Sequence, residues 1–347
     1  MGLPSGTFNQ NYAQDAAIVR TRAQWVMLLA LLAFLFTCPL YFNDQWMSRL
    51  TIIGITVISV HGLSILTGYC DQISIGHAGF MAVGGYTSAV LCSKLGWTFW
   101  AALPCAALMA GMMGLLFGLP SLRVKGFYLI MATIAAHFII IWLILQLRST
   151  TGGADGMSVP RVALGSFVFK SKSSYYYLVM ILACLATFVA INIVRTRAGR
   201  AFIAIRDNEV AAEVMGINLW GYKLLAFFIG CVYAGVAGSL LVHYYAFASP
   251  TQFPFIDSVW FLGMLIVGGM GSTTGAILGT VSLRLLDELV TIVGPILSAV
   301  VAAQAAASLS LIMRGLVIIL FLIFEPRGLA HRWEMIKAYF KLWPFSY

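Results

Sequence analysis

The sequence predicts an all-α fold, a polytopic transmembrane helical bundle of about 10 (8–10) spans with both termini in the cytoplasm. Its 347 residues are 61% hydrophobic and only 10% charged, whereas soluble domains average about half apolar and a quarter charged. Several stretches without Asp, Glu, Lys or Arg approach or exceed the about 20 apolar residues that span a hydrocarbon core. These stretches are 25–42, 96–122, 126–147, 175–194 and 224–256. Finally, Lys and Arg gather in alternate loops between the apolar runs.

The helices are expected in order at 25–42, 50–67, 72–93, 98–118, 126–146, 175–194, 224–247, 257–271, 275–293 and 307–324. Counts of eight or nine stay open because 268–279 is rich in glycine and 294–306 is apolar without an obvious role. Arg20 and Arg22 precede the first run, and no convincing small-x-small cleavage site follows it. We therefore expect an uncleaved helix rather than a signal peptide.

The loop charges predict the side of the membrane on which each loop lies. With the N-terminus inside, the inner loops hold roughly twice as many Lys and Arg residues as the outer loops. The expected organisation is a cytoplasmic tail over 1–24, a transmembrane domain over 25–325 and a cytoplasmic tail over 326–347. Within the domain, one inner loop covers about 195–223 and the longest outer loop about 148–174. The net charge of +9 has the same origin, so we expect no nucleic-acid partner.

A polar, glycine-rich stretch, "GYCDQISIGHAGF", interrupts the apolar sequence at residues 68–80. Gly68 can end one helix, and Asp71 can cap the next by accepting hydrogen bonds from free backbone N–H groups. Small residues then recur on one helical face, which allows another backbone to approach closely. These residues are Ser74, Ala78, Ala82, Gly85 and Ser88.

Two interpretations of this stretch stay open. It is either a tight cytoplasmic turn before a packing helix, or a broken helix whose exposed backbone lines a substrate path. For His77, packing is favoured over a proton or substrate role. The candidate pore or helix-interface residues are Gly68, Asp71, Gln72, Ser74, Gly76, His77 and Gly79.

The inner loop contains "RTRAGRAFIAIRDNEVAAEVMGI", residues 195–217, in which a short helix is expected. Asp207 is the expected N-cap, Glu209 favours the first turn, and Gly216 is the expected stop. A helix of about two turns is marginal alone in water, so its apolar face should pack against something. A partner protein is favoured over the chain's own helices. The apolar face carries Val210, Ala211, Val214 and Met215, and the opposite face carries Glu209, Ala212 and Glu213.

Two further glycine-rich stretches are open to more than one interpretation. "TTGGADGM", 150–157, fits a shaped docking loop or a flexible connector on the outer side. Its candidate docking residues are Thr151, Gly152, Gly153, Asp155 and Gly156. "VGGMGSTTGAILG", 267–279, lacks the lysine of a phosphate-binding loop and indicates close helix packing or a broken helix. No Walker A motif occurs in the chain, so any ATP that drives it is bound by another chain.

The chain carries no motif typical of an enzyme or a metal site. The six cysteines are far apart and show no C-x-x-C, so they are expected to be packing residues. No G-x-S-x-G and no paired-carboxylate arrangement stands out. Asp287 and Glu288 follow Arg284 at about one turn, so we expect local pairing. A membrane-bound enzyme is therefore disfavoured, and no cofactor is expected on this chain.

Six stretches together resemble the LivM type of permease from branched-chain amino acid ABC transporters. They are "TGYCDQISIGHAGFMAVGGYTSAVL", "LPSLRVKGFYLIMATIA", "TTGGADGM", "RTRAGRAFIAIRDNEVAAEVMGIN", "FLGMLIVGGMGSTTGAILG" and "EPRGL", in the family's order. The resemblance covers roughly 60–330 and implies a bacterial inner-membrane importer. Its implied partners are a second permease, two cytoplasmic ATP-binding subunits, a periplasmic substrate-binding protein and membrane lipid.

The resemblance also implies roles for the open stretches. Residues 207–216 become the coupling helix that docks in an ATPase groove. Ala211, Ala212 and Gly216 match the family's E-A-A-x-x-x-G pattern, although Val210 is inserted after Glu209. Residues 151–156 become a docking surface for the binding protein, and 68–79 a pore-side or interface element. The expected function is import of branched-chain amino acids or related small polar solutes. The alternative is a stand-alone secondary transporter or channel, which would bury the 207–216 helix against itself.

Overall fold

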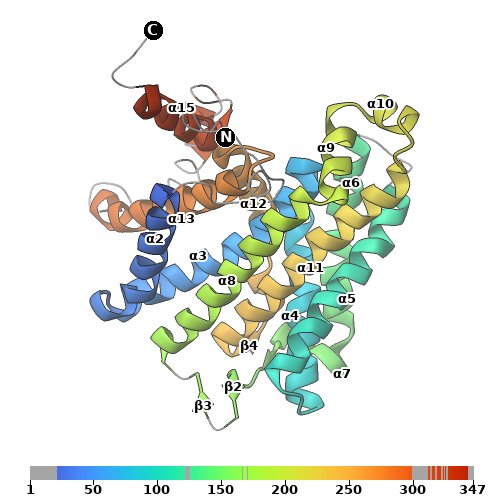
Figure 1. Cartoon of the computed structure of the whole chain (residues 1–347). Coiled ribbons are helices and arrows are strands. Elements are labelled where there is room, and N and C mark those ends of the chain that lie inside the picture. Colours follow the sequence, from blue (N-terminus) through green and yellow to red (C-terminus); the bar gives the residue numbers. More distant parts are fainter. Residues whose placement is uncertain are drawn as a thin grey trace.

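The computed structural model describes residues 22–121, 126–165, 167–169, 171–298, 312, 315–316, 319–321, 323, 325 and 327–342. Helices make up most of this part of the chain, which confirms the all-α class (Figure 1). Six of its helical segments are long and apolar enough to cross a membrane. The expected count of eight to ten spans exceeds these six. The expected helix at 307–324 lies mostly outside the described residues, as does the tail over 1–24.

The long helices largely follow the expected order. They are α2 Arg22–Tyr41, α3 Asp44–Leu63, α4 His77–Lys94, α5 Phe99–Ser121, α6 Phe127–Gln146, α8 Lys172–Arg195, α11 Leu219–Tyr245, α12 Phe255–Gly268, α13 Thr273–Ser298 and α15 Gly328–Leu342. A π-helix, η1 Ser64–Tyr69, continues α3 without a break. The shorter helices are α7 Arg148–Thr151, η2 Gly153–Asp155, α9 Arg197–Asp207, α10 Glu209–Val214 and η3 Pro250–Gln252.

Helix α11 lies at the centre of the bundle and packs against α3, α4 and α5. The small-residue face expected on α4 is confirmed, because Ala78, Ala82, Gly85 and Ser88 are all buried. On α11, a β-carbon at Gly238 would overlap the backbone carbonyl of Met81 in α4. The two backbones are therefore in direct contact, and hydrogen at this position is the only substituent that fits.

The apolar side chains that do not pack inward cover the outside of the bundle. On α5, α6 and α8 they include Leu116, Trp142 and Phe188, each more than half exposed. A soluble protein rarely exposes such a continuous apolar surface, and a hydrocarbon environment accounts for it.

Two short antiparallel pairs of β-strands, which the sequence did not predict, accompany the helices. β1 Met157–Ser158 pairs with β4 Phe247–Ala248, and β2 Ala163–Leu164 pairs with β3 Phe167–Val168.

The loops gather at two opposite ends of the bundle (Figure 1). α9 and α10 lie at one end, whereas α7, β2 and β3 lie at the other. α8 and α11 each run from one end to the other. The segments 195–223 and 148–174 thus lie at opposite ends of the bundle, and the side of the membrane on which each lies stays a prediction.

The helix expected at 72–93 begins five residues later than predicted, at His77. Asp71 is not its N-cap, and that prediction is wrong. Asp71 has a φ of 55°, in the left-handed region that Asn and Asp tolerate better than most residues. Gly76 occupies the cap position without any side-chain cap. Residues 71–76 therefore form a non-helical connection between η1 and α4.

Gly238→Ala tests whether the α4–α11 contact supports the bundle. The added methyl group would force the two backbones apart, and such overpacking costs about 1–3 kcal/mol or more. We expect a lower thermal transition of the purified protein in detergent, measured by size-exclusion recovery after heating. Gly315→Ala is the control, because a β-carbon there meets nothing within 4 Å. Equal transition temperatures for the two variants would contradict the assigned contact.

Candidate functional site

The segment that carries α9 and α10 begins its short helix one residue later than predicted. Asn208, not Asp207, is the N-cap, and its Oδ1 accepts from the backbone N–H of Ala211 at 3.0 Å. Asn208 is extended with φ −162°, which is the conformation of a cap residue. Asp207 is the last residue of α9, where its carboxylate accepts two hydrogen bonds from Arg206 at 3.0 and 3.1 Å.

Gly216 ends the short helix as predicted. Its φ is +83°, and its N–H donates to the carbonyl of Glu213 at 2.9 Å. The next N–H, of Ile217, donates to the carbonyl of Ala212 at 3.0 Å. These bonds satisfy carbonyls at the end of α10, and glycine adopts the left-handed conformation without strain.

The two faces of α10 carry the residues predicted for them. On the face opposite the apolar one, Ala212 is buried and Glu209 is mostly buried, whereas Glu213 is exposed. Val210, Val214 and Met215 are 69%, 81% and 81% exposed, and Ala211 is exposed as well. Ala212 faces inward because the turn formed by Asn208 and Gly216 brings that side of the helix against its neighbours. The apolar side chains therefore point away from the chain.

Two charged contacts hold this segment against the helices. Glu209 Oε1 pairs with Lys223 Nζ of α11 at 2.5 Å, and both side chains are mostly buried. Arg206 Nη1 donates to the carbonyl of Gly68, at the end of η1, at 3.4 Å. α10 is thus attached both to the central helix and to the glycine-rich stretch that begins at residue 68.

That stretch lies against a second glycine-rich stretch. A β-carbon at Gly68 would lie 2.8 Å from the backbone N of Gly271, in the turn between α12 and α13. A β-carbon at Gly271 would in turn lie 2.5 Å from Arg206 Nη1. Arg206 therefore contacts two interruptions of the helical backbone at once. Asp71 is exposed nearby, where partial desolvation raises the pKa of its carboxyl and the Arg206 charge opposes that shift.

The remaining residues of 68–79 are buried and contact neighbouring helices. His77 donates from Nε2 to the carbonyl of Ser59 in α3 at 3.0 Å. Gly76 and Gly79 leave no room for a β-carbon against Thr133 and His137 of α6. Gln72 and Ser74 are also buried, and the Gln72 carbonyl accepts from Thr67 Oγ1 at 2.9 Å. These contacts place the buried residues of 68–79 at helix interfaces, and a pore-side role for the stretch stays a prediction.

The outer loop has a fixed shape built on three left-handed glycines, Gly152, Gly153 and Gly156. Thr151 is buried, and its hydroxyl donates to the carbonyl of Ile144 at 2.6 Å. These contacts favour a shaped loop over the flexible connector. Asp155 in this loop is exposed.

A buried chain of hydrogen bonds ties this loop to the bundle. Ser239 donates to Ser88, and Ser88 contacts His243 Nε2, both at 2.8 Å. His243 Nδ1 then lies 2.9 Å from the carbonyl of Pro160. Because a carbonyl only accepts, Nδ1 carries the proton and Nε2 accepts from the Ser88 hydroxyl. The network joins α4, α11 and the outer loop.

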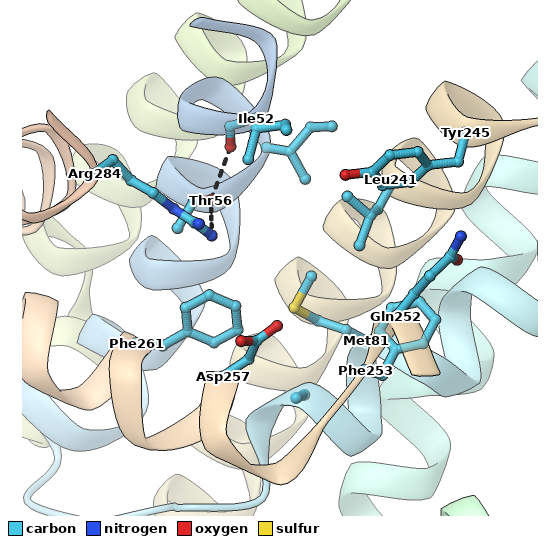
Figure 2. A pocket seen from close by; sticks show the side chains of 12 residues that line it. Ile52, Thr56, Met81, Leu241, Tyr245, Gln252, Phe253, Asp257, Phe261 and Arg284 are labelled. Atoms are coloured by element: carbon cyan, nitrogen blue, oxygen red, sulfur yellow. Dashed lines mark hydrogen bonds between the residues drawn. The ribbon is translucent and has the colours of Figure 1, made fainter. Parts of the chain in front are cut away.

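A cavity of about 270 Å³, which the sequence did not predict, lies between α3, α4, α11, α12 and α13 (Figure 2). Asp257 and Arg284 both line it, together with Tyr245. Arg284 Nη2 donates to Thr56 Oγ1 at 3.0 Å. Ionisable residues in membrane segments are functional candidates by default, and that signal was available at both positions. It was overlooked because the two residues are far apart in the sequence and meet only in the fold.

The sequence predicted that Asp287 and Glu288 pair locally with Arg284, and for Glu288 this prediction is wrong. Glu288 pairs with Arg49 of α3 at 2.5 Å, because α13 lies alongside α3 and brings the two charges together.

In the part of the chain that the structure covers, no group of three or more His, Cys, Asp or Glu residues could hold a metal ion. The features that stand out are thus an exposed apolar helix, a shaped outer loop and a charged cavity, which suit binding and conformational change.

Comparison with known proteins identifies relatives over most of the chain. A family model described as the permease component of the branched-chain amino acid transport system matches residues 45–322. The high-affinity branched-chain amino acid permease protein LivM of Escherichia coli K12 is 31% identical over 333 residues, covering 89% of this chain and 75% of the relative.

More distant relatives match a similar extent. LivH of Escherichia coli K12 is 25% identical over 86% of this chain and 98% of its own length. The autoinducer 2 import permease LsrC of Yersinia enterocolitica is 24% identical over 93% of this chain and 78% of its own length. No solved structure matches. The family match and the identity to LivM together show that this chain belongs to the permease components of branched-chain amino acid transport systems.

Proposed function

We propose that the chain is the membrane-spanning permease subunit of a binding-protein-dependent ABC importer for branched-chain amino acids or related small polar solutes. Transport proceeds by alternating access and is driven by partner ATPases. The observation that carries the proposal is the exposed apolar face of α10, with Val214 and Met215 each 81% exposed on a segment anchored to the bundle. A stand-alone secondary transporter has no reason to leave that face uncovered.

The proposal includes the partners and the location. In the complex, a second permease completes the pore, two cytoplasmic subunits bind ATP, and a periplasmic protein delivers the solute. The chain itself binds no cofactor and performs no covalent chemistry. It spans the bacterial inner membrane with α10 and both termini in the cytoplasm and the 148–174 loop in the periplasm. The basic residues around α9 support this orientation.

In this mechanism α10 is the coupling helix, and force reaches the bundle through its two charged anchors. Movement of the ATPases displaces α10 and pulls on α11 through Glu209 and Lys223. It also pulls on the junction of Gly68 and Gly271 through Arg206. Interrupted helices are the positions at which a bundle bends most readily, because the regular hydrogen-bond ladder is already broken there. The halves of the pore then rock between inward and outward access.

Affinity purification of the tagged chain from native membranes tests the assembly. Mass spectrometry of the mild-detergent extract should recover two P-loop ATPases and a second permease. Recovery of the chain alone, under conditions that preserve a known ABC complex, would favour the stand-alone transporter.

Val214→Asp tests the docking role of α10. A carboxylate in the apolar contact would be desolvated without a partner, so docking should weaken. We expect normal membrane insertion, continued ATP hydrolysis, and uptake reduced by about tenfold or more in reconstituted vesicles. Val214→Leu keeps the apolar character and serves as the control. Normal uptake by the aspartate variant would refute the coupling assignment.

Arg206→Gln tests the path from α10 to the helix junction. The variant loses the charge that joins Asp207 to Gly68 while keeping a similar chain length. Uptake should fall relative to ATP hydrolysis, because docking is intact but its movement reaches the bundle poorly. Arg200→Gln is the matched control, since Arg200 lies on the same helix and donates to the nearby carbonyl of Arg195 instead of to the helix junction. If both variants keep the wild-type ratio of uptake to hydrolysis, Arg206 does not transmit the movement.

Asp155→Lys tests the docking of the periplasmic binding protein on the outer loop. Reversing the exposed charge should weaken a complementary contact without disturbing the loop, whose shape depends on Thr151 and the glycines. The concentration of binding protein that gives half-maximal ATPase stimulation should rise by about tenfold. Asp44→Lys, another exposed acidic position at a helix start, is the control. An unchanged half-maximal concentration would argue against docking at this loop.

A further inference from the structure

Helix α15 carries apolar and basic side chains close together on its exposed surface. We propose that α15 binds the anionic phospholipid headgroups of the membrane surface on the side where α10 lies. The inference goes beyond the proposed function, because it concerns a lipid partner and depends on neither the solute nor the ATP-binding subunits.

The first turn of α15 is fixed to the turn between α12 and α13. A β-carbon at Gly328 would lie 2.5 Å from the Cα of Gly269, and Ala330 is buried. The same turn contains Gly271, which lies next to Arg206 of α9. α15 therefore begins on the side of the bundle that carries α9 and α10. The helix packs on α12 and α13 and lies at the edge of the bundle (Figure 1).

The residues before α15 place its start close to the membrane surface. Ile312, Ile319 and Ile323 are each more than half exposed, and a hydrocarbon environment accounts for such apolar side chains. The Gly328 N–H donates to the carbonyl of Glu325 at 2.9 Å, so the chain turns directly after them. α15 thus starts where the chain leaves the hydrocarbon, and the side chains of its next turns are within reach of the headgroups.

The exposed apolar side chains of α15 suit the boundary between headgroups and acyl chains. Trp333 and Ile336 are 42% and 46% exposed, and their spacing of three residues places them on one face of the helix. Tyr339, three residues further on, is 61% exposed. Trp and Tyr are enriched at membrane–water interfaces because their rings are apolar with one polar end. Helices with such a face lie in the plane of the membrane surface.

Basic side chains lie beside these apolar ones. Lys337 is one turn after Trp333, and its ammonium group lies 5.2 Å from the centre of the Trp333 ring. Arg332 is also exposed; it pairs with Glu325, and its guanidinium has further N–H donors. From residue 326 onward the sequence holds four Lys or Arg and a single Glu. This charge complements a surface of phosphate groups, which long basic side chains can reach while their stems contact apolar atoms.

The chemistry of α15 differs from that of α10 on the same side. α10, Glu209–Val214, contains two Glu and no Lys or Arg, so an anionic surface would repel it. α15 combines aromatic and basic side chains, which such a surface attracts. The contrast favours a protein partner for α10 and the lipid surface for α15.

Hydrogen–deuterium exchange in lipid nanodiscs tests the assignment, using the full chain purified with the subunits that accompany it. One preparation contains phosphatidylcholine alone, and the other contains an equal mixture of phosphatidylcholine and phosphatidylglycerol. We expect the backbone amides of 331–342 to exchange about tenfold more slowly in the mixture, because bound headgroups keep the helix formed. Salt at about 1 M should remove most of this difference, because it shortens the Debye length to about 3 Å.

Arg332→Gln/Lys337→Gln removes two charges from α15 at a similar helix propensity. Each basic side chain near an anionic surface contributes a factor of about five to binding, so most of the slowing should be lost. Arg197→Gln/Arg200→Gln is the matched control, because it removes two exposed charges from α9 on the same side. The control should keep the slowing. If the α15 variant keeps it as well, its basic side chains do not bind the headgroups and the assignment is overturned.

Trp333→Ala/Ile336→Ala tests the apolar half of the same surface. This variant keeps every charge of α15, and it should also lose much of the slowing, because interfacial binding depends on buried apolar area. Equal exchange of the wild-type amides in the two lipid preparations would overturn the assignment. If that exchange is slow in both, a protein contact covers α15 instead. None of these outcomes involves transport, so the importer is tested separately.

Discussion

The contact of α11 with α4 through backbone atoms is the constraint on which the arrangement of the bundle depends. Between helices in lipid there is little hydrophobic driving force, so close packing and hydrogen bonds must hold them together. Gly235 and Gly238 of α11 lie directly against Gly84 and the Met81 carbonyl of α4. α11 also packs on α3 and α5, so this close approach sets the position of three neighbours. The wall of the cavity formed by Met81 and Leu241 follows from it.

Polar groups inside the bundle occupy positions where they join separate elements. The Ser239–Ser88–His243 network links two helices to the outer loop. At the other end, Lys223 and Arg206 link α10 to α11 and to the end of η1. In a low-dielectric interior such bonds are strong and their loss is costly. They attach each loop to the helices at several points.

The two surfaces proposed to contact protein partners lie at different places in the fold. The exposed apolar face of α10 lies at one end of the bundle and the shaped loop at the other. α10 is anchored by charged side chains, and the outer loop takes its shape from glycine turns.

Much of the fold could be predicted from the sequence because its signals are local. Runs of apolar residues determine helices, and the bounds of α5, α6 and α8 agree closely with those expected. Gly216 ended its helix as expected because a left-handed residue after a short helix is a local preference. Caps were harder to predict. Asp207 and Asp71 both have the right chemistry, but α9 continues through Asp207 and Asp71 adopts a left-handed turn.

The sequence by itself determined the class of protein, the order of its helices and the location of its glycine-rich interruptions. Only the tertiary structure decided which side of α10 is buried and which charges line the same cavity. It also decided that Glu288 pairs with Arg49 of α3. Those outcomes depend on contacts between residues far apart in the chain, such as Arg206 with Gly68. Periodicity and composition carry no information on such pairs, because many helix arrangements satisfy the same apolar pattern. Backbone contacts at particular glycines select one of them.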